Sequence, residues 1–328
     1  MALAELSRTE STGTDRRCII RGAPSGSEPK VARMSGGFNR SWGAEFDRIA
    51  AGKLATSSED RLRELVRWRG SSSFFSASEI AAGADAGVTP IAQVIGLSAG
   101  ILMEGYVRTT HRGQGRPKAG IARWREHSGP LISWNMVRER ALARLAAQAE
   151  IVEAHAIVGV KCRRHQGEGA EGHIEVEFRG TAVRVAGWQR RRDANPVPTL
   201  ASAEEVWGLL TSGVEPAGIV GSFARVETLP SSSTASTTMG LGQYTANVEL
   251  PDLTKAVYEA RRLALSRLSA DAEKLKADGV VGVQITRDES QPGPFRGLHL
   301  TLHVLGSAVR RTRRAALNVS PIVTMSNG

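Results

Sequence analysis

Cysteine is scarce in this chain of 328 residues, which contains only Cys18 and Cys162. Two cysteines cannot form the dense disulfide framework of a small secreted domain, and their scarcity is typical of a reducing compartment. No apolar run approaches the roughly 18 residues of a membrane span, and the first residues lack the continuous apolar core of a secretory signal. The sequence therefore predicts a soluble, cytoplasmic protein that does not associate with membranes.

Motifs of familiar enzymes are also missing. The stretch GQGRPKAG lacks the lysine–serine pair of a phosphate-binding loop, and GLGQYTA does not stand between a strand and a helix as a dinucleotide fingerprint would. The chain has no serine elbow and no His-Glu-x-x-His pair. We therefore predict a protein that is not an enzyme and has no catalytic or cofactor-binding residues.

The overall composition is that of a globular protein, with 41% hydrophobic and 23% charged residues. Lysine and arginine number 43 against 33 acidic residues, which gives a formal net charge of +10. Such a charge permits attraction to nucleic acid without establishing it.

The chain contains an internal duplication. Residues 138–160 align without a gap with residues 261–283, and about half of the positions are identical. Further on, HIEVEFRGTAVR (173–184) aligns with HLTLHVLGSAVR (299–310), and upstream AGVTPIAQVIG (86–96) resembles SGVEPAGIVG (212–221). A repeat of this length indicates two copies of one structural unit.

Each copy is expected to form the same elements. A short apolar run gives a first strand, a glycine-rich or polar insert gives a loop, and leucines and alanines at helical spacing give an amphipathic helix. Two further strands follow, and alternating apolar residues predict one buried face. The predicted fold is α/β of the α+β type, with two tandem β-α-β-β units, each a helix packed on a small antiparallel sheet.

The predicted boundaries follow changes in composition along the chain. They are a disordered N-terminal segment (1–41), a short amphipathic helical segment (42–73), unit 1 (74–187), a linker (188–199), unit 2 (200–312) and a mobile basic tail (313–328). The unpatterned stretch ends near Met34, so we expect residues 1–33 to pack on nothing and Met34, as well as Met1, to be a candidate translation start.

Gly159 and Gly282 stand at equivalent places in the strand that follows the helix of each copy. Glycine inside a strand indicates a bulge or a close approach of another backbone. We expect a side chain at either position to collide with the helix or a neighbouring strand.

The second copy carries ELPDLTKAVYEARRLALSRLSADAEKLKADGVVGV (249–283) and LHVLGSAVR (302–310), and the first carries RERALARLAAQAE (138–150), IVGV (157–160) and RGTAVR (179–184). These stretches resemble the YbjQ-like family, whose members are called heavy-metal-binding domains. The resemblance implies a small α/β unit with a helix on an antiparallel sheet, assembly into rings, typically pentamers, and no established catalytic activity. It implies no ligand motif, so no residue is assigned a role from it.

Metal ligands are suggested by the residues alone. Cys162, His165 and His173 lie close in sequence at a strand end, with His155 just upstream, and thiolate and imidazole groups suit a divalent transition metal. Of these, only His173 recurs in the second copy, as His299, and a repeated histidine at a strand edge is more often a packing residue. The function that the family resemblance implies is a non-catalytic, self-assembling homo-oligomer that binds a heavy metal or small ligand at a subunit boundary.

A nucleic-acid-associated protein is the alternative prediction. The loop at residues 108–125 is basic and contains an interleaved tryptophan, which could contact phosphates and stack on a base. No nucleic-acid-binding fold motif accompanies this loop, and the second copy lacks its charge, so we favour the assembly protein.

Overall fold

The computed structural model describes residues 38–101, 123–126, 129–166, 173–188, 195–229, 231, 249–290 and 298–312. The chain divides into one unit of residues 1–44 and a second unit of residues 45–328, which contains both copies of the repeat. The predicted basic tail (313–328) and most of the predicted disordered segment (1–41) lie outside the described residues. No helix in the described ranges is long and apolar enough to cross a membrane.

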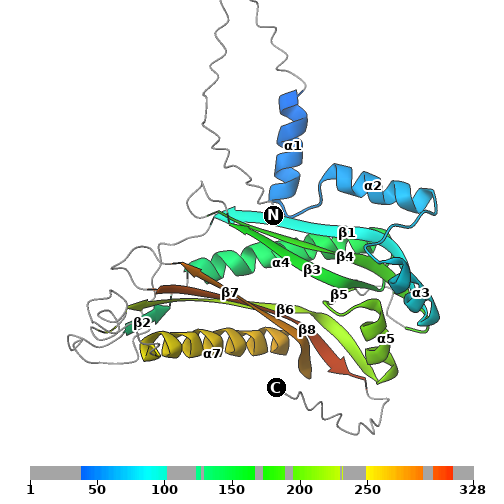
Figure 1. Cartoon of the computed structure of the whole chain (residues 1–328). Helices are drawn as coiled ribbons and strands as arrows, with labels where there is room; N and C mark the ends of the chain where they lie inside the picture. Colours follow the sequence, from blue (N-terminus) through cyan, green and yellow to red (C-terminus); the bar gives the residue numbers. More distant parts are fainter. Residues whose placement is uncertain are drawn as a thin grey trace, which may run out of the picture. The chain divides into compact units, whose positions relative to one another are not determined.

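In the described residues, and apart from the short strand β2 of the first repeat, the two repeats contain the same elements in the same order (Figure 1). Two helices come before them, α1 (Phe38–Ala50) and α2 (Thr56–Arg67). Repeat 1 consists of α3 (Ala77–Asp85), β1 (Val88–Ile101), β2 (Arg123–Glu126), α4 (Gly129–Ile151), β3 (Ala156–Gln166) and β4 (His173–Val185). Repeat 2 follows the short strand β5 (Val197–Pro198) and consists of α5 (Ala203–Thr211), β6 (Val214–Leu229), α7 (Pro251–Lys274), β7 (Gly279–Ser290) and β8 (Leu298–Arg311). The α+β prediction is confirmed.

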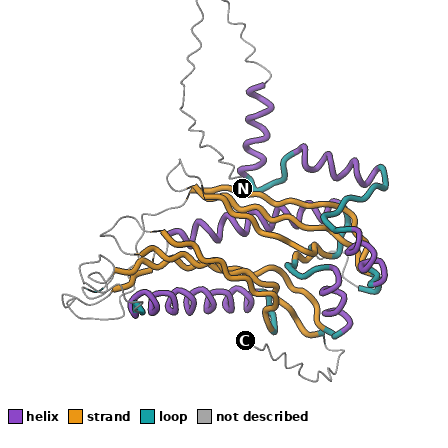
Figure 2. The backbone as a smooth tube through the Cα atoms, viewed as in Figure 1, coloured by secondary structure: helices purple, strands orange, loops and turns teal. Residues whose placement is uncertain are grey.

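Each repeat builds its own sheet, and the strands of each lie side by side in Figure 2. Sheet 1 has the order β1-β4-β3-β5 and sheet 2 the order β2-β6-β8-β7, so the three equivalent strands are arranged alike. The pairings among these equivalent strands are antiparallel. Register shifts also recur at equivalent places, between Val158 and Lys161 in β3 and between Val281 and Gln284 in β7. Both copies therefore share one strand order, as two copies of one structural unit should.

The helices α3 and α5 begin at the same signal. Ser76 caps α3 by accepting a hydrogen bond from the backbone N–H of Glu79, whose carboxylate accepts one from the N–H of Ser76. Ser202 and Glu205 form the same reciprocal capping box at the start of α5, 126 residues later. The duplication therefore includes a helix before the first strand of each copy, which the predicted β-α-β-β unit lacks.

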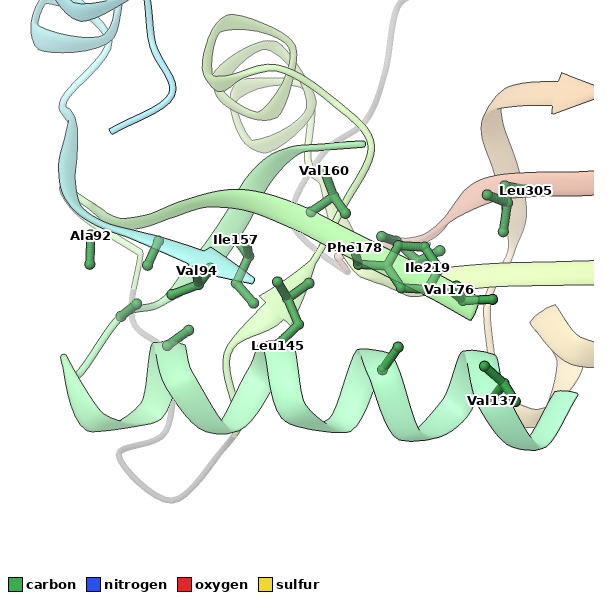
Figure 3. Packing of buried hydrophobic residues seen from close by; sticks show 14 of the residues in the cluster. Ala92, Val94, Val137, Leu145, Ile157, Val160, Val176, Phe178, Ile219 and Leu305 are labelled. Carbon is green, nitrogen blue, oxygen red and sulfur yellow. The ribbon is translucent and has the colours of Figure 1, made fainter. Parts of the chain in front are cut away.

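The helices and sheets form alternating layers, with sheet 1, α4, sheet 2 and α7 following one another (Figure 1). Leu145 of α4 belongs to one buried cluster with Val94 and Phe178 of sheet 1, and the same cluster includes Ile219 and Leu305 of sheet 2 (Figure 3). The opposite face of sheet 2 packs on α7 in a second cluster. Each face of sheet 2 thus packs on one helix, and α4 links the two repeats.

The glycines of β3 and β7 have a different role from the one predicted. A Cβ atom added to Gly159 or Gly282 would meet no atom within 4 Å, so the expected collision is wrong. Both residues instead have positive φ angles, of 60° and 61°, at the register shift of their strands. Glycine adopts this left-handed conformation without the steric penalty that other residues incur.

The close approaches occur at other glycines. A Cβ atom on Gly96 would collide with the backbone of α4 at Ala141, and one on Gly306 would collide with the side chain of Val280. Glycine at position 96 therefore lets α4 lie directly on β1.

The insert of the first copy is not a loop throughout. Residues 123–126 form β2, which pairs with β6 of the second repeat. The carboxylate of Glu126 accepts a hydrogen bond from Arg267 of α7. Composition could not indicate this strand, because its partner lies in the other repeat.

Candidate functional site

The predicted metal ligands lie on two neighbouring strands of sheet 1. Cys162 of β3 pairs with Phe178, whose side chain is buried in the core, whereas His165 pairs with Glu175. Because side chains alternate along a strand, Cys162 and His165 occupy opposite faces of the sheet. His173, at the start of β4, shares the face of Glu175.

Burial also works against Cys162 as a ligand. It raises the pKa of the Cys162 thiol to about 11, so the thiol is protonated near neutral pH, whereas metals bind the thiolate. Within the described ranges, no group of three or more histidine, cysteine, aspartate or glutamate residues is placed to hold a metal ion. Cys162, His165 and His173 therefore do not form a common ligand set in one chain, and their role in metal binding stays a prediction.

His155, the upstream histidine of the predicted cluster, has a structural role. Its backbone N–H donates to the carbonyl of Val183 at 2.8 Å, and its ring Nδ1 accepts from the N–H of Val185 at 3.1 Å. These bonds join the turn after α4 to the end of β4.

The basic loop of the alternative prediction lies outside the described residues up to position 122. Its last three residues, 123–125, belong to β2, whose backbone pairs with β6. Nucleic-acid binding by this loop stays a prediction.

A pocket of about 150 Å³ lies where the two repeats meet. It is lined by Arg164, His165, Ile174, Phe223, Arg225, Asp288, Thr301 and His303. The first three belong to repeat 1 and the others to repeat 2, so the pocket exists only because the repeats are joined.

The charges of this pocket are linked across the junction. Arg164 of repeat 1 donates to the carboxylate of Asp288 of repeat 2 at 3.3 Å. His303 Nε2 lies 3.5 Å from the same carboxylate oxygen. Burial, and then the charge of Arg164, place the pKa of His303 well below its usual value, so the ring is neutral at physiological pH.

His303 is held by aromatic contacts from both repeats. Its ring centroid lies 4.8 Å from that of Trp134 on α4 and 4.8 Å from that of Phe223 on β6, edge to face in both cases. The lining therefore combines two arginines, one carboxylate and two histidines, with His303 neutral. Sequence reasoning missed Arg164, Arg225 and His303, since no local pattern distinguishes them from other strand residues.

One polar contact of the junction is made by Arg138, which is 3% exposed. It donates to the carboxylate of Asp271 on α7 at 2.8 Å and to the carbonyl oxygen of Gly221 on β6. Asp271 in turn accepts from the N–H of Gly221 at 3.1 Å. Residues of one helix from each repeat thus satisfy the backbone of one strand.

A second polar contact lies at the edge of β3. The N–H groups of Gly159 and Val160 donate to the carbonyl oxygens of Ala201 and Thr199, at 2.7 and 3.1 Å. Thr199 also donates through its hydroxyl to Ser307 of β8 at 3.0 Å. The segment 197–201 therefore joins the edge of sheet 1 to sheet 2.

This architecture defines a chain of two fused α+β repeats, joined by a packed core cluster and by hydrogen bonds between the repeats. The sequence model of the family described as "Putative heavy-metal-binding" matches residues 132–186 and 228–311. The model thus matches one segment in each repeat, which confirms the resemblance seen in the sequence.

One curated relative is the encapsulin nanocompartment protein of Mycobacterium tuberculosis. It is 35% identical to this chain over 179 residues, which make up 53% of this chain and 65% of the relative. The chain therefore spans less than two thirds of the relative's length.

Proposed function

We propose that this chain is a non-catalytic, self-assembling protein that forms homo-oligomers. The observation that carries the proposal is the exposed apolar surface of β7. Val281, Val283 and Ile285 are 38%, 43% and 43% exposed, and we name the apolar surface of β7 that they form the C-terminal face. This surface includes both sides of β7, because Val281 pairs with Ser307 and Ile285 with Val304, on opposite faces of sheet 2. Exposed apolar patches of this kind mark sites of protein association.

The equivalent positions in repeat 1 show what such a surface looks like when it is covered. Val158 and Val160 stand where repeat 2 has Val281 and Val283, and they are 0% and 3% exposed. Cys162, the equivalent of Ile285, is partly buried. The same strand is therefore buried in one repeat and open in the other.

The edge of β7 is open in a second sense. β7 is the last strand in the order of sheet 2, and in the described part of the chain no strand pairs with its outer edge, whereas β3 pairs with β5. An open strand edge beside apolar side chains is a site for pairing with another chain.

The comparisons support assembly and not a reaction. The relative's name refers to a nanocompartment and the family's description to binding, and neither refers to catalysis. The relative's name supports a structural role in which the chain contributes to a larger particle. A cytoplasmic location is part of the same proposal.

The test is the mass of the purified full-length protein in solution, measured by light scattering over a range of concentrations. We expect a species larger than one chain at micromolar concentration. A single-chain mass at every concentration would contradict the proposed function.

The proposed function also includes metal binding at a subunit boundary. Because Cys162, His165 and His173 do not meet within one chain, a site that used them would need groups from a neighbouring subunit. Elemental analysis of tag-free protein, before and after Cys162→Ser, tests this directly. A stoichiometric metal content that Cys162→Ser abolishes would support the predicted ligand.

A further inference from the structure

We infer that the C-terminal face of one chain docks on repeat 1 of a second copy, in the way that repeat 1 docks on repeat 2 within the chain. The inference rests on the proposed self-assembly and names its partner surface. The junction inside the chain is the template, since it shows how one repeat covers the other.

In the template, α5 of repeat 2 contributes an apolar helix face. Val206 of α5 is fully buried in a cluster with Val158, Val183 and Val185 of sheet 1. The equivalent of Val206 in repeat 1 is Ile80 of α3, which is 43% exposed. A helix face that is buried in repeat 2 is therefore open in repeat 1.

Sheet 2 contributes the other part of the template. Phe223 of β6 is 3% exposed in the cluster that includes α4, and its equivalent Leu97 of β1 is 43% exposed. Ile95, beside Leu97 on the same face of sheet 1, is 40% exposed. Ile80, Ile95 and Leu97 define what we name the N-terminal face.

The segment that binds the strand edge also has an equivalent. In repeat 2 the N–H of Leu200 donates to Ser307, and in repeat 1 the N–H of Phe74 donates to Thr181 at the equivalent place. The segment around Phe74 thus lies on sheet 1 as the segment 197–201 lies on sheet 2. In a second copy it would be placed to cover the edge of β7, as the segment 197–201 covers the edge of β3.

The C-terminal face and the N-terminal face are consequently equivalent to the two surfaces that meet at the junction between the repeats within one chain. Each chain has one C-terminal face and one N-terminal face, and they differ from each other. A contact between unlike faces is heterologous, so it continues from chain to chain until a ring closes.

The test uses two variants that each damage one face. Val283→Asp places a charge on the C-terminal face, and Leu97→Asp places one on the N-terminal face. Both side chains are exposed in the single chain, so we expect each variant to fold with an unchanged melting temperature and to have the mass of one chain. Ser266→Asp is the control, because Ser266 and its equivalent Ala143 are both exposed, which places this position outside the contact. It should keep the wild-type mass.

Mixing the two variants is the decisive measurement. In the mixture, Val283→Asp supplies an intact N-terminal face and Leu97→Asp an intact C-terminal face. We therefore expect complexes of two chains and nothing larger. Failure of the mixture to form this pair, or a wild-type mass for either single variant, would overturn the inference. The proposed self-assembly would still stand if the wild-type protein has a mass larger than one chain.

The chain's own C-terminal residues are the other possible occupant. SPIVTM (320–325) resembles NPVPTL (195–200), which includes β5. A wild type that stays single while deletion of residues 313–328 makes it assemble would assign the face to this segment and overturn the inference.

Discussion

Arg138 of repeat 1 and Asp271 of repeat 2 form a partly buried ion pair, 2.8 Å between Nη1 and Oδ2, that joins the two helices of the duplication. The equivalent of Asp271 is Gln148, whose amide both accepts from the N–H of Ile95 and donates to its carbonyl, at 3.0 and 2.8 Å. A carboxylate can only accept, so in repeat 2 the donor to the carbonyl of Gly221 comes from Arg138. Arg138 of repeat 1 therefore donates to Gly221 of repeat 2 the hydrogen bond that Gln148 donates to Ile95 within repeat 1.

Arg138→Ala should lower the free energy of unfolding by about 3 kcal/mol, because it leaves Asp271 partly buried without its charge partner. Arg140→Ala, two residues along the same helix at an exposed position, should change it by less than about 0.5 kcal/mol. Urea unfolding at a fixed protein concentration measures both. Equal losses in the two variants would show that the pair contributes nothing specific.

Stability should fall in acid through Asp271. Burial acts to raise the pKa of its carboxyl, but the charge and hydrogen bond of Arg138 outweigh burial and hold the pKa below its ordinary value. A carboxyl with a lowered pKa in the folded state stabilises the fold above about pH 4, and this contribution is lost as the pH falls toward the folded value. Asp271→Asn should remove this part of the pH dependence, which unfolding measured between pH 6 and pH 3 would show. An identical pH profile for the variant would contradict the assignment.

Gly282→Ala should destabilise the protein by about 1–2 kcal/mol, because alanine is strained at a φ of 61° although space is available for its methyl group. Gly279→Ala is the control, since φ is not positive there and its Cβ would lie 3.8 Å from Val309. Thermal unfolding of both variants tests whether backbone strain, and not collision, explains the glycine. The two variants should differ clearly in melting temperature, and equal values would refute the explanation.

Gly96→Ala should also destabilise, by about 1–3 kcal/mol, but for a steric reason. Its methyl group would collide with the backbone of α4, which must move away from β1. Gly208→Ala, in the interior of α5 with no atom within 4 Å of the new Cβ, should stabilise by up to about 1 kcal/mol. Opposite signs in urea unfolding are the expected result, and a harmless Gly96→Ala would mean that α4 is not held close to the sheet.

The duplication could be predicted because its signals are local. Apolar alternation in β4 and β8 and the helical spacing of α4 and α7 depend on neighbouring residues alone. The helices α3 and α5 were missed although Ser76 with Glu79, and Ser202 with Glu205, carry a recognisable capping signal. Their short apolar faces gave no clear period.

The junction could not be predicted from one sequence. β2 is a strand only because β6 lies beside it, and the pocket of Arg164 and Arg225 exists only where two sheets meet. The left-handed glycines show the same limit, because a sequence pattern indicates a special backbone at Gly159 without deciding between a bulge and a collision. Relative placement of the repeats is the missing information in the first two cases.

Fusion of the two repeats has an arithmetical consequence for any closed ring that the heterologous contact produces. Every complete chain contributes two positions, so the ring contains an even number of repeats, and a circle of five repeats is ruled out for whole chains. Covalent and non-covalent junctions must alternate around it. The two kinds of junction differ in sequence, because Gly221 leaves room for the guanidinium of Arg138 at the covalent junction, whereas Ile95 carries a side chain at the equivalent position. A ring in which two kinds of junction alternate has half the rotational symmetry that its number of repeats suggests.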